Sequence, residues 1–168
     1  MLLNIESAKK DSGRAFTARF EEIPSCPEFP ISYEIVKPVV LETEYTYAEG
    51  EVLCKGSFTA VIKVMCSRCL KEFEYDAACS FEERFAPALS DEVSYTIVED
   101  AISFDKLVLD YIHAELPQSF LCKEDCKGLC PVCGKDLNEA DCGCIIDNEI
   151  KTINPFSKLE GLFNNEEV

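Results

Sequence analysis

The sequence is poor in the residues that catalytic and nucleic-acid-binding sites use most. It has one histidine in 168 residues and no tryptophan, and its 16 Lys and Arg face 32 Asp and Glu, a formal net charge of −16. So acidic a surface repels phosphate backbones, and no Lys/Arg cluster offers a local basic patch. The charge therefore favours either a solubilising surface or attraction to a basic protein partner.

Membrane and secretion signals are missing as well. No apolar run approaches the roughly 18 residues that cross a bilayer. The opening "MLLNIESAKKDSGRAF" lacks the basic start, the long apolar stretch and the cleavage site of a secretory signal. We therefore expect a cytoplasmic protein, built as one domain with a small appendage, because this length can bury a real core.

Recognisable catalytic motifs are also absent. The chain has no Gly-rich phosphate loop, no G-x-S-x-G and no H-E-x-x-H. The one histidine, His113, falls between the apolar positions of a predicted helix, which is typical of a surface residue. Carboxylate pairs are too common in so acidic a chain to indicate acid–base chemistry. We expect that the protein is not an enzyme and has no small-molecule substrate.

Alternation of apolar and polar residues predicts a β-rich first part. Residues 51–65 alternate Val, Cys, Phe and Ile with Lys, Ser and Thr, the pattern of a strand with one buried face. Similar patterns predict strands at 14–23, 33–47, 70–85 and 93–99. Because short turns join the three long strands, we expect an antiparallel meander, either open or closed into a barrel.

The hydrophobic period changes near residue 103. Apolar residues recur at helical spacing between Leu107 and Leu116, Ser103 can cap the start, and Pro117 stops the helix. The sequence thus predicts an α+β fold: an antiparallel sheet with one main helix near 104–116 and a small C-terminal zinc-binding cysteine cluster. We expect a β-rich domain at 1–120 and, packed on it, a cysteine-rich tail at 121–168 with a short helix after Pro155.

Six of the eleven cysteines lie in "CKEDCKGLCPVCGKDLNEADCGC" at residues 122–144. In "CPVCG", a tight turn points two thiolates at one ion, and the glycine that follows permits a positive φ. "CGC" follows after a short polar hairpin, so four cysteines form a self-contained site. Zinc is the ion that we expect these cysteines to bind. The alternatives are mononuclear iron, a disulfide or a redox pair.

A second site is predicted from two further pairs. "CKEDC" supplies two cysteines, and the turn "CSRC" between two strands supplies two more if the chain after the helix folds back. The alternatives are ordinary strand-end thiols at "CSRC", or an exchange of ligands between the sites. The predicted metal ligands are Cys66, Cys69, Cys122, Cys126, Cys130, Cys133, Cys142 and Cys144.

Two such sites would serve structure. All their ligands come from protein, so no position is open for a substrate water, and two structural zinc ions would contribute folding energy to the tail. The other cysteines are not predicted to bind metal. Cys54 and Cys79 are expected in the core, and Cys26 lies in a loop.

The order of these motifs resembles the YceD family, the bacterial large ribosomal RNA subunit accumulation proteins. The likeness covers most of the chain: "CSRCLKEFEYD", a helix ending in "ELP", "LCKEDCKGLCPVCGKDLN" and "INPFSKLEGL". The C-x-R-C signature with a following aromatic corresponds to Cys66, Arg68, Cys69 and Phe73. Other members lack the later cysteines, which implies that the site built on Cys130 is an optional stabiliser.

The resemblance implies a non-enzymatic role in the synthesis, processing or stability of large-subunit rRNA. Combined with the charge, it suggests an acidic factor that binds a basic ribosomal protein or a pre-large-subunit particle and contacts rRNA through that partner. Two alternatives remain. One is a direct RNA-binding zinc module, which would need a basic patch beside the C-x-x-C turns, or knuckles. The other is a thiol redox protein.

Overall fold

The computed structural model describes residues 1–26, 33–88 and 93–144, and the tail helix expected after Pro155 lies outside these ranges. The chain divides into two compact units, residues 1–126 and 127–168. The first unit contains every helix and strand that the structure describes. This division falls after Cys126, and the predicted boundary at 120/121 stays a prediction.

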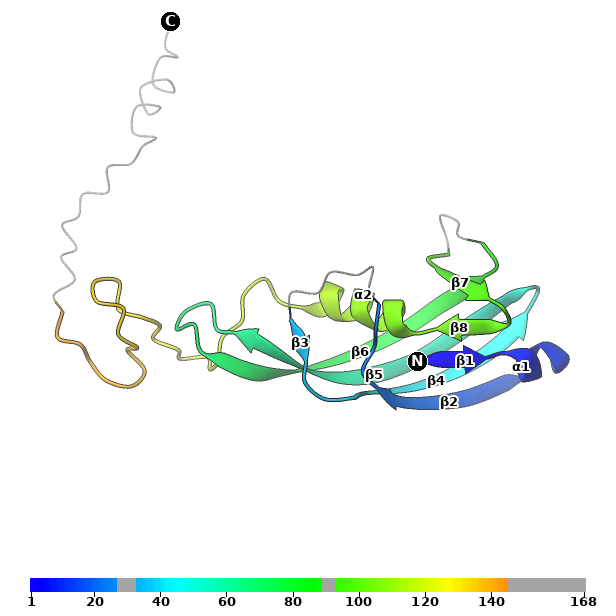
Figure 1. Cartoon of the computed structure of the whole chain (residues 1–168), viewed down its shortest axis with the longest axis horizontal. Helices are drawn as coiled ribbons and strands as arrows, with labels where there is room; N and C mark the ends of the chain where they lie inside the picture. Colours follow the sequence, from blue (N-terminus) through cyan, green and yellow to red (C-terminus); the bar gives the residue numbers. More distant parts are fainter. Residues whose placement is uncertain (27–32, 89–92, 145–168) are drawn as a thin grey trace, which may run out of the picture. The chain divides into compact units, whose positions relative to one another are not determined.

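The first unit is a β-rich fold with two short helices (Figure 1). The elements are β1 (Leu2–Asn4), α1 (Glu6–Lys10), β2 (Ala15–Glu22), β3 (Glu34–Ile35), β4 (Val39–Ala48), β5 (Glu51–Met65), β6 (Glu72–Ala86), β7 (Tyr95–Val98), β8 (Ala101–Ser103) and α2 (Asp105–Glu115). The strand expected at 33–47 is divided into β3 and β4, with Pro38 between them. A proline has no N–H to donate to a ladder.

The strands form one mixed sheet in the order β1-β8-β7-β6-β5-β4-β2, with β3 paired to β5. The strands β4, β5 and β6 form the predicted antiparallel meander, and β2 extends it by pairing antiparallel with β4. The expectation of a purely antiparallel sheet is wrong at β7. This strand starts where β6 ends and runs parallel to it, through the pairs Phe85↔Tyr95 and Ala86↔Thr96.

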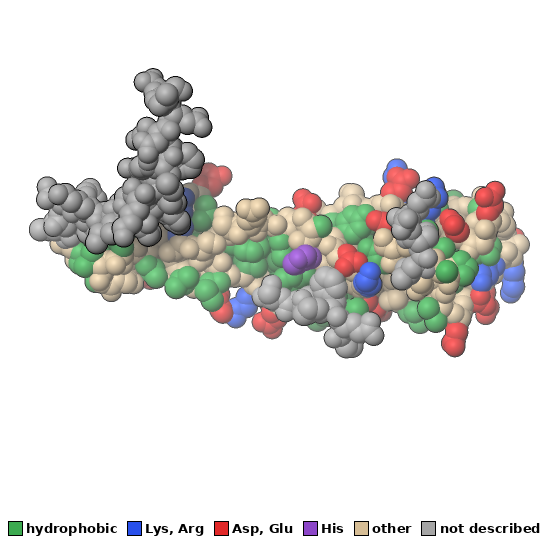
Figure 2. Space-filling model, turned by 90° about the horizontal axis from the view of Figure 1, so that it is seen from above, with side chains coloured by type: hydrophobic (Ala, Val, Ile, Leu, Met, Phe, Trp, Pro, Cys, Tyr) green, Lys and Arg blue, Asp and Glu red, His purple; other side chains and the backbone are tan. Residues whose placement is uncertain are grey.

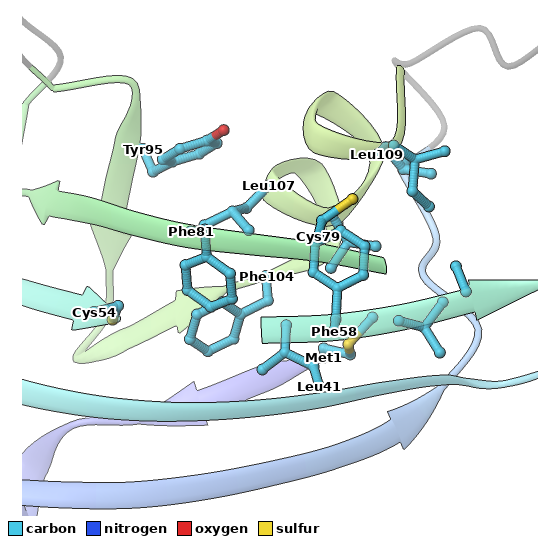
Figure 3. Packing of buried hydrophobic residues seen from close by; sticks show 14 of the residues in the cluster. Met1, Leu41, Cys54, Phe58, Cys79, Phe81, Tyr95, Phe104, Leu107 and Leu109 are labelled. Atoms are coloured by element: carbon cyan, nitrogen blue, oxygen red, sulfur yellow. The ribbon is translucent and has the colours of Figure 1, made fainter. Parts of the chain in front are cut away.

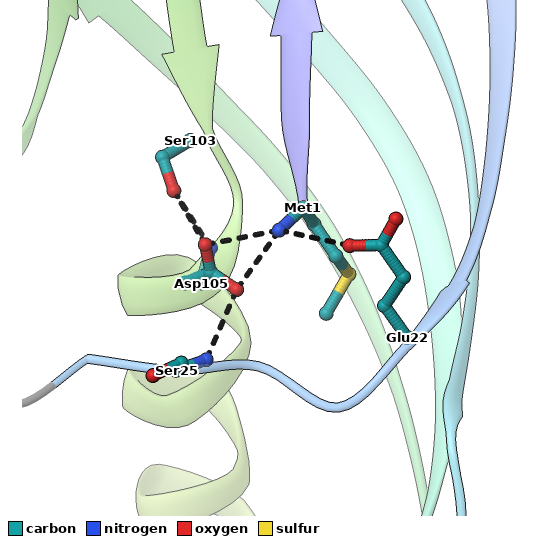
Figure 4. A network of polar contacts seen from close by, with 5 residues as sticks. All are labelled: Met1, Glu22, Ser25, Ser103 and Asp105. Atoms are coloured by element: carbon teal, nitrogen blue, oxygen red, sulfur yellow. Dashed lines mark hydrogen bonds and ion pairs between the residues drawn. The ribbon is translucent and has the colours of Figure 1, made fainter.

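The two edge strands, β1 and β2, approach each other, so the sheet is nearly closed and barrel-like. The amino-terminal ammonium of Met1 lies 3.3 Å from the Glu22 carboxylate at the end of β2. It also donates hydrogen bonds of 3.0 Å to both carboxylate oxygens of Asp105 in α2 (Figure 4). The same carboxylate accepts the backbone N–H of Ser25. Polar contacts thus join both edges and the helix.

The helix α2 begins close to the predicted position, but its cap differs. Phe104 is the residue at the N-cap, and it has no side-chain capping bond. Ser103 stands one residue earlier, where its hydroxyl accepts the Asp105 N–H at 3.3 Å. Neither described helix is both long and apolar enough to reach across a bilayer.

The core lies between the sheet and α2. The rings of Phe81 and Phe85 pack on Phe104, with centroids 6.1 and 5.6 Å away. Figure 3 shows the Phe81 ring beside that of Phe104. Cys54 and Cys79 are buried among these apolar residues, which confirms their predicted place in the core. Burial raises the pKa of the Cys54 thiol to about 12, so it stays a neutral, inert thiol.

Two backbone features explain how the long strands pack so closely. Glu49 and Gly50 both have positive φ, which fits the two-residue turn that joins β4 to β5. In β5, a Cβ atom on Gly56 would lie 2.2 Å from the Glu42 carbonyl oxygen of β4. Only glycine fits there, because the two backbones are in direct contact.

Candidate metal centres

The first group of cysteines joins the turn after β5 to the segment after α2. Cys66 and Cys69 lie in the β5–β6 turn, and Cys122 and Cys126 follow α2. The Sγ atoms of Cys66 and Cys126 are 3.8 Å apart, and those of Cys69 and Cys122 are 3.6 Å apart. All four Sγ atoms lie within 4.8 Å of one another, so they could hold one ion.

The second group lies wholly within the second unit. The Sγ atoms of Cys130, Cys133, Cys142 and Cys144 also lie within 4.8 Å of one another. The structure therefore brings the eight cysteines together in the same two sets of four that the sequence spacing indicates. None of the eleven cysteines, all within the described residues, forms a disulfide.

The donor sets fit a tetrahedral metal. Zinc–sulfur bonds of about 2.3 Å in a tetrahedron place neighbouring sulfurs about 3.8 Å apart. The two measured Sγ–Sγ distances of 3.6 and 3.8 Å match that spacing. Four thiolates are the donors of closed structural zinc sites and also suit iron. Each site could hold an ion with no position left for a substrate.

The first knuckle, the C-x-x-C turn at Cys66 and Cys69, is a tight turn fixed by two backbone hydrogen bonds. The Leu70 N–H donates to the Cys66 carbonyl oxygen at 2.9 Å, and the Cys66 N–H donates to the Lys71 carbonyl oxygen at 2.9 Å. These bonds turn the backbone around the pair of thiols, so both sulfurs face the same side.

The second knuckle, the C-x-x-C turn at Cys130 and Cys133, has the same pattern of backbone hydrogen bonds. The Gly134 N–H donates to the Cys130 carbonyl oxygen at 2.8 Å, and the Cys130 N–H donates to the Lys135 carbonyl oxygen at 2.8 Å. Both knuckles thus have the form C-x-x-C followed by a turn residue and a lysine. The shared geometry is what two thiolates need to face one ion.

The turn residue itself differs between the knuckles. Gly134 has a φ of +74°, which glycine adopts without strain, whereas Leu70 has a φ of +60°. A left-handed conformation costs an L-residue roughly 1–2 kcal/mol. Sequence reasoning missed Leu70, although the signal was visible: a leucine stands in "CSRCLK" where glycine stands in "CPVCGK".

In each group, the surroundings of one cysteine lower the pKa of its thiol. Hydrogen bonds from backbone N–H groups, that of Cys69 first, lower the pKa of Cys66 to about 6. In the second group, the backbone N–H of Cys133 is the largest of the influences that lower the pKa of Cys130 to about 6. In contrast, burial raises the pKa of Cys122 to about 12. One cysteine of each group is thus ready to bind, and a metal ion would deprotonate the rest.

Protein contacts position the first group independently of any ion. The guanidinium of Arg68 donates to the Cys126 carbonyl oxygen at 2.9 Å. The Ser67 N–H donates to the Phe120 carbonyl oxygen at 2.8 Å, and the Phe120 N–H donates to the Ser67 hydroxyl at 3.2 Å. The Phe120 ring packs edge-on against Tyr75 of β6, with centroids 5.3 Å apart. The chain after α2 is therefore anchored on the sheet.

The second group has far less support from packing. Within residues 127–144 only Gly128 and Cys130 are buried, and Cys133 is exposed. Hydrogen bonds give the loop its form; for example, the Lys127 N–H donates to the Asn138 side-chain oxygen at 2.9 Å. With so little apolar burial in residues 127–144, an ion bound by the four thiols would supply most of the stability of this segment.

The remaining predicted site features are peripheral. His113 is exposed on α2 and belongs to neither cysteine group. Lys and Arg side chains lie scattered among Asp and Glu on the face that Figure 2 shows. Near the first knuckle, Lys63 lies 2.7 Å from Glu72 and Lys123 lies 3.8 Å from Asp125. These two lysines near the first knuckle thus each have a carboxylate close by.

The fold and these sites first define a class: a mixed, nearly closed sheet with two four-cysteine groups that could each hold a metal ion. A family model described as "Large ribosomal RNA subunit accumulation protein YceD" matches residues 54–163, which include all eight cysteines of the two groups. The chain belongs to the YceD family, as the sequence motifs predicted.

Similar proteins come from bacteria and plants. An uncharacterized protein of Mycobacterium leprae is 26% identical over 134 residues, which cover 73% of this chain and 61% of the relative. An uncharacterized protein of Mycobacterium tuberculosis is 33% identical over 97 residues, 54% of this chain and 46% of the relative. The maize protein "Large ribosomal RNA subunit accumulation protein YCED homolog 1, chloroplastic" is 25% identical over 161 residues, 75% of this chain and 54% of the relative.

The chain therefore spans only 46% to 61% of the length of these relatives. No solved structure matches it.

Proposed function

We propose that this protein is a non-enzymatic cytoplasmic factor that supports the accumulation of large-subunit rRNA and carries two structural zinc ions. It acts by binding a basic ribosomal protein or a pre-large-subunit particle. The observation that carries the proposal is the pair of four-thiolate groups in a member of the YceD family. The family description supports a role in the accumulation of large-subunit rRNA, and the four-thiolate donor sets support a structural role for the metal.

The closed donor sets support a structural rather than a catalytic role. A catalytic zinc site keeps one position for water or substrate, whereas each group here supplies four sulfur ligands. Cys66, whose pKa is lowered, is buried and faces three other sulfurs rather than a substrate cavity. A redox dithiol needs two sulfurs, so four within reach of one another favour metal binding.

The charge supports a basic protein partner rather than bare RNA. The chain carries a net charge of −16, and each four-thiolate site with a divalent ion adds about −2 more. A direct RNA-binding module would need unpaired cations gathered beside the knuckles. Lys55, Lys63 and Lys123 lie 3.5, 2.7 and 3.8 Å from carboxylates. Contact with rRNA through a basic protein fits these pairings better.

Depletion of the protein tests the process. We expect large-subunit rRNA and large subunits in sucrose gradients to fall relative to small subunits, and plasmid-borne wild-type protein to restore them. A matched control carries Cys26→Ser, since Cys26 lies outside both groups. Unchanged subunit ratios on depletion would refute the role. Salt-sensitive recovery of bare rRNA fragments by the purified protein, without ribosomal protein, would refute indirect contact.

A further inference from the structure

The two cysteine groups differ in how far solvent reaches them. In the first group three of the four cysteines are buried and the fourth is half-buried. In the second group only Cys130 is buried; Cys142 and Cys144 are half-buried, and Cys133 is exposed. A bound ion keeps all of its sulfur ligands as thiolates. The thiolates of the second group are therefore more open to dissolved reagents, and Cys133 is the most open of the four.

The residues between the cysteines also differ between the two knuckles. In the first knuckle, the backbone N–H of Ser67 and the guanidinium of Arg68 donate hydrogen bonds of 2.8 and 2.9 Å to carbonyl oxygens of the chain that returns after α2. Pro131 and Val132 stand at these positions in the second knuckle. Proline has no N–H and valine has no polar side chain, so neither can donate the equivalent bond.

The four sulfurs of the second group lie close enough to react with one another. All four Sγ atoms are within 4.8 Å of one another, and a disulfide of about 2 Å needs only a small approach. Only Gly128 and Cys130 are buried within residues 127–144, so little packing resists that movement. An exposed thiolate beside partner thiols is the arrangement of redox-sensing cysteines.

We propose that the second group is a peroxide-sensitive zinc switch: oxidation at Cys133 releases its ion and unfolds residues 127–144, while the first group keeps its ion. The inference rests on the zinc binding in the proposed function and adds the regulation of one of the two sites. A disulfide leaves at most two thiolates for the ion, too few for the four-coordinate site of a structural zinc. Without the ion, the segment has little buried surface to keep it folded.

The chemistry uses two thiolates and one molecule of hydrogen peroxide. The Cys133 thiolate attacks one peroxide oxygen; an S–O bond forms, the O–O bond breaks, hydroxide leaves and a sulfenic acid remains. A second thiolate of the group attacks this sulfur; the S–S bond forms, the S–O bond breaks and hydroxide leaves again. The two sulfurs give up two electrons to the peroxide, and two protons from solvent convert both hydroxides to water. A thiol reductant reverses the oxidation by thiol–disulfide exchange.

The test adds hydrogen peroxide to the full-length zinc-loaded chain. A zinc-binding dye measures the released ion, and mass spectrometry of the alkylated and digested protein locates the disulfide. We expect one ion to leave and the first disulfide to contain Cys133, with the other ion leaving at least about tenfold more slowly. Dithiothreitol and added zinc should restore the original zinc content.

Two matched variants identify the ion that leaves. Cys69→Ser lacks a ligand of the first group and should still release one ion to peroxide, at the wild-type rate. Cys133→Ser lacks a ligand of the second group and should keep its remaining ion under the same conditions. Cys26→Ser is the control for the thiols outside both groups, and it should respond like the wild type.

Four results would overturn the inference. They are release of both ions at the same rate, loss of the ion from Cys133→Ser at the wild-type rate, a first disulfide without Cys133, and no zinc release by peroxide. A wild type that binds no zinc would refute this inference together with the structural metal of the proposed function. The depletion experiment tests the role in rRNA accumulation separately. If large-subunit rRNA falls on depletion but peroxide releases no zinc, that role stands and the switch does not exist.

Discussion

The sharpest prediction concerns the two ions and single cysteine-to-serine changes. Cys69→Ser and Cys133→Ser each remove one thiolate from a different group. Serine is a poor ligand for zinc at neutral pH, because its hydroxyl keeps its proton. We expect about two zinc ions in the wild type, one in each single variant and none in the double variant.

The two variants should differ in what unfolds. Structural zinc contributes roughly 10–16 kcal/mol in small zinc-binding peptides, and residues 127–144 bury only Gly128 and Cys130. Cys133→Ser should therefore unfold this segment and leave the sheet intact. The sheet has its own core, built on residues such as Phe58 and Phe81, and this core does not include the cysteines of the first group. Cys69→Ser should therefore release the chain after α2 from the β5–β6 turn without melting the sheet.

Metal analysis of freshly purified protein gives the ion counts, and two-dimensional amide NMR locates the loss of structure. Cys26→Ser is the control, since it should retain both ions. If both variants lose the same single ion, or if Cys133→Ser loses both, the division into two independent sites is wrong. If the wild type holds no metal and forms reversible disulfides, the structural-metal reasoning fails entirely.

Three further predictions follow from the backbone and the thiolates. Gly56→Ala should destabilise the protein by about 2–4 kcal/mol in urea unfolding, because its Cβ would meet the Glu42 carbonyl oxygen at 2.2 Å; an effect below 1 kcal/mol would show that β4 moves easily. Leu70→Gly should leave the thermal midpoint unchanged or higher, whereas Leu70→Val should lower it, since a β-branched residue resists positive φ; the reverse order would contradict the strain at this position. The pKa values of Cys66 and Cys130 are lowered to about 6 from a usual 9.0, so their thiolates stabilise the fold at high pH and lose that contribution as pH falls through about 6. In the metal-free protein, the ultraviolet absorbance of these two thiolates should therefore persist down to about pH 6, and its loss near pH 9 would refute this.

Local patterning predicted the long elements well and the short ones poorly. The strand at 51–65 was predicted at the limits it has, because alternation over most of its fifteen residues indicates a single long strand. β1 and α1 were missed, because elements of three and five residues are too short to show a hydrophobic period in the sequence. The parallel pairing of β7 was missed because it rests on two residue pairs, and which strands become neighbours is decided by tertiary packing.

At the sites, spacing predicted which cysteines gather. A C-x-x-C turn brings its two thiols together locally, and Pro117 allowed the chain after α2 to fold back. The contacts of Phe120 that direct this return have no signature in the sequence. The strain at Leu70 was also missed, because φ is a property of the folded turn. It becomes readable only when the two knuckles are compared residue by residue.

That comparison gives the two metal sites different roles. The knuckle at Cys130 has the relaxed glycine and little buried surface around it, as expected for a metal that only holds a segment in shape. The knuckle at Cys66 is built on the end of the longest hairpin and holds a strained, exposed leucine. An ion bound there would fix the turn and hold the chain after α2 against it, while the sheet stays folded on its own core.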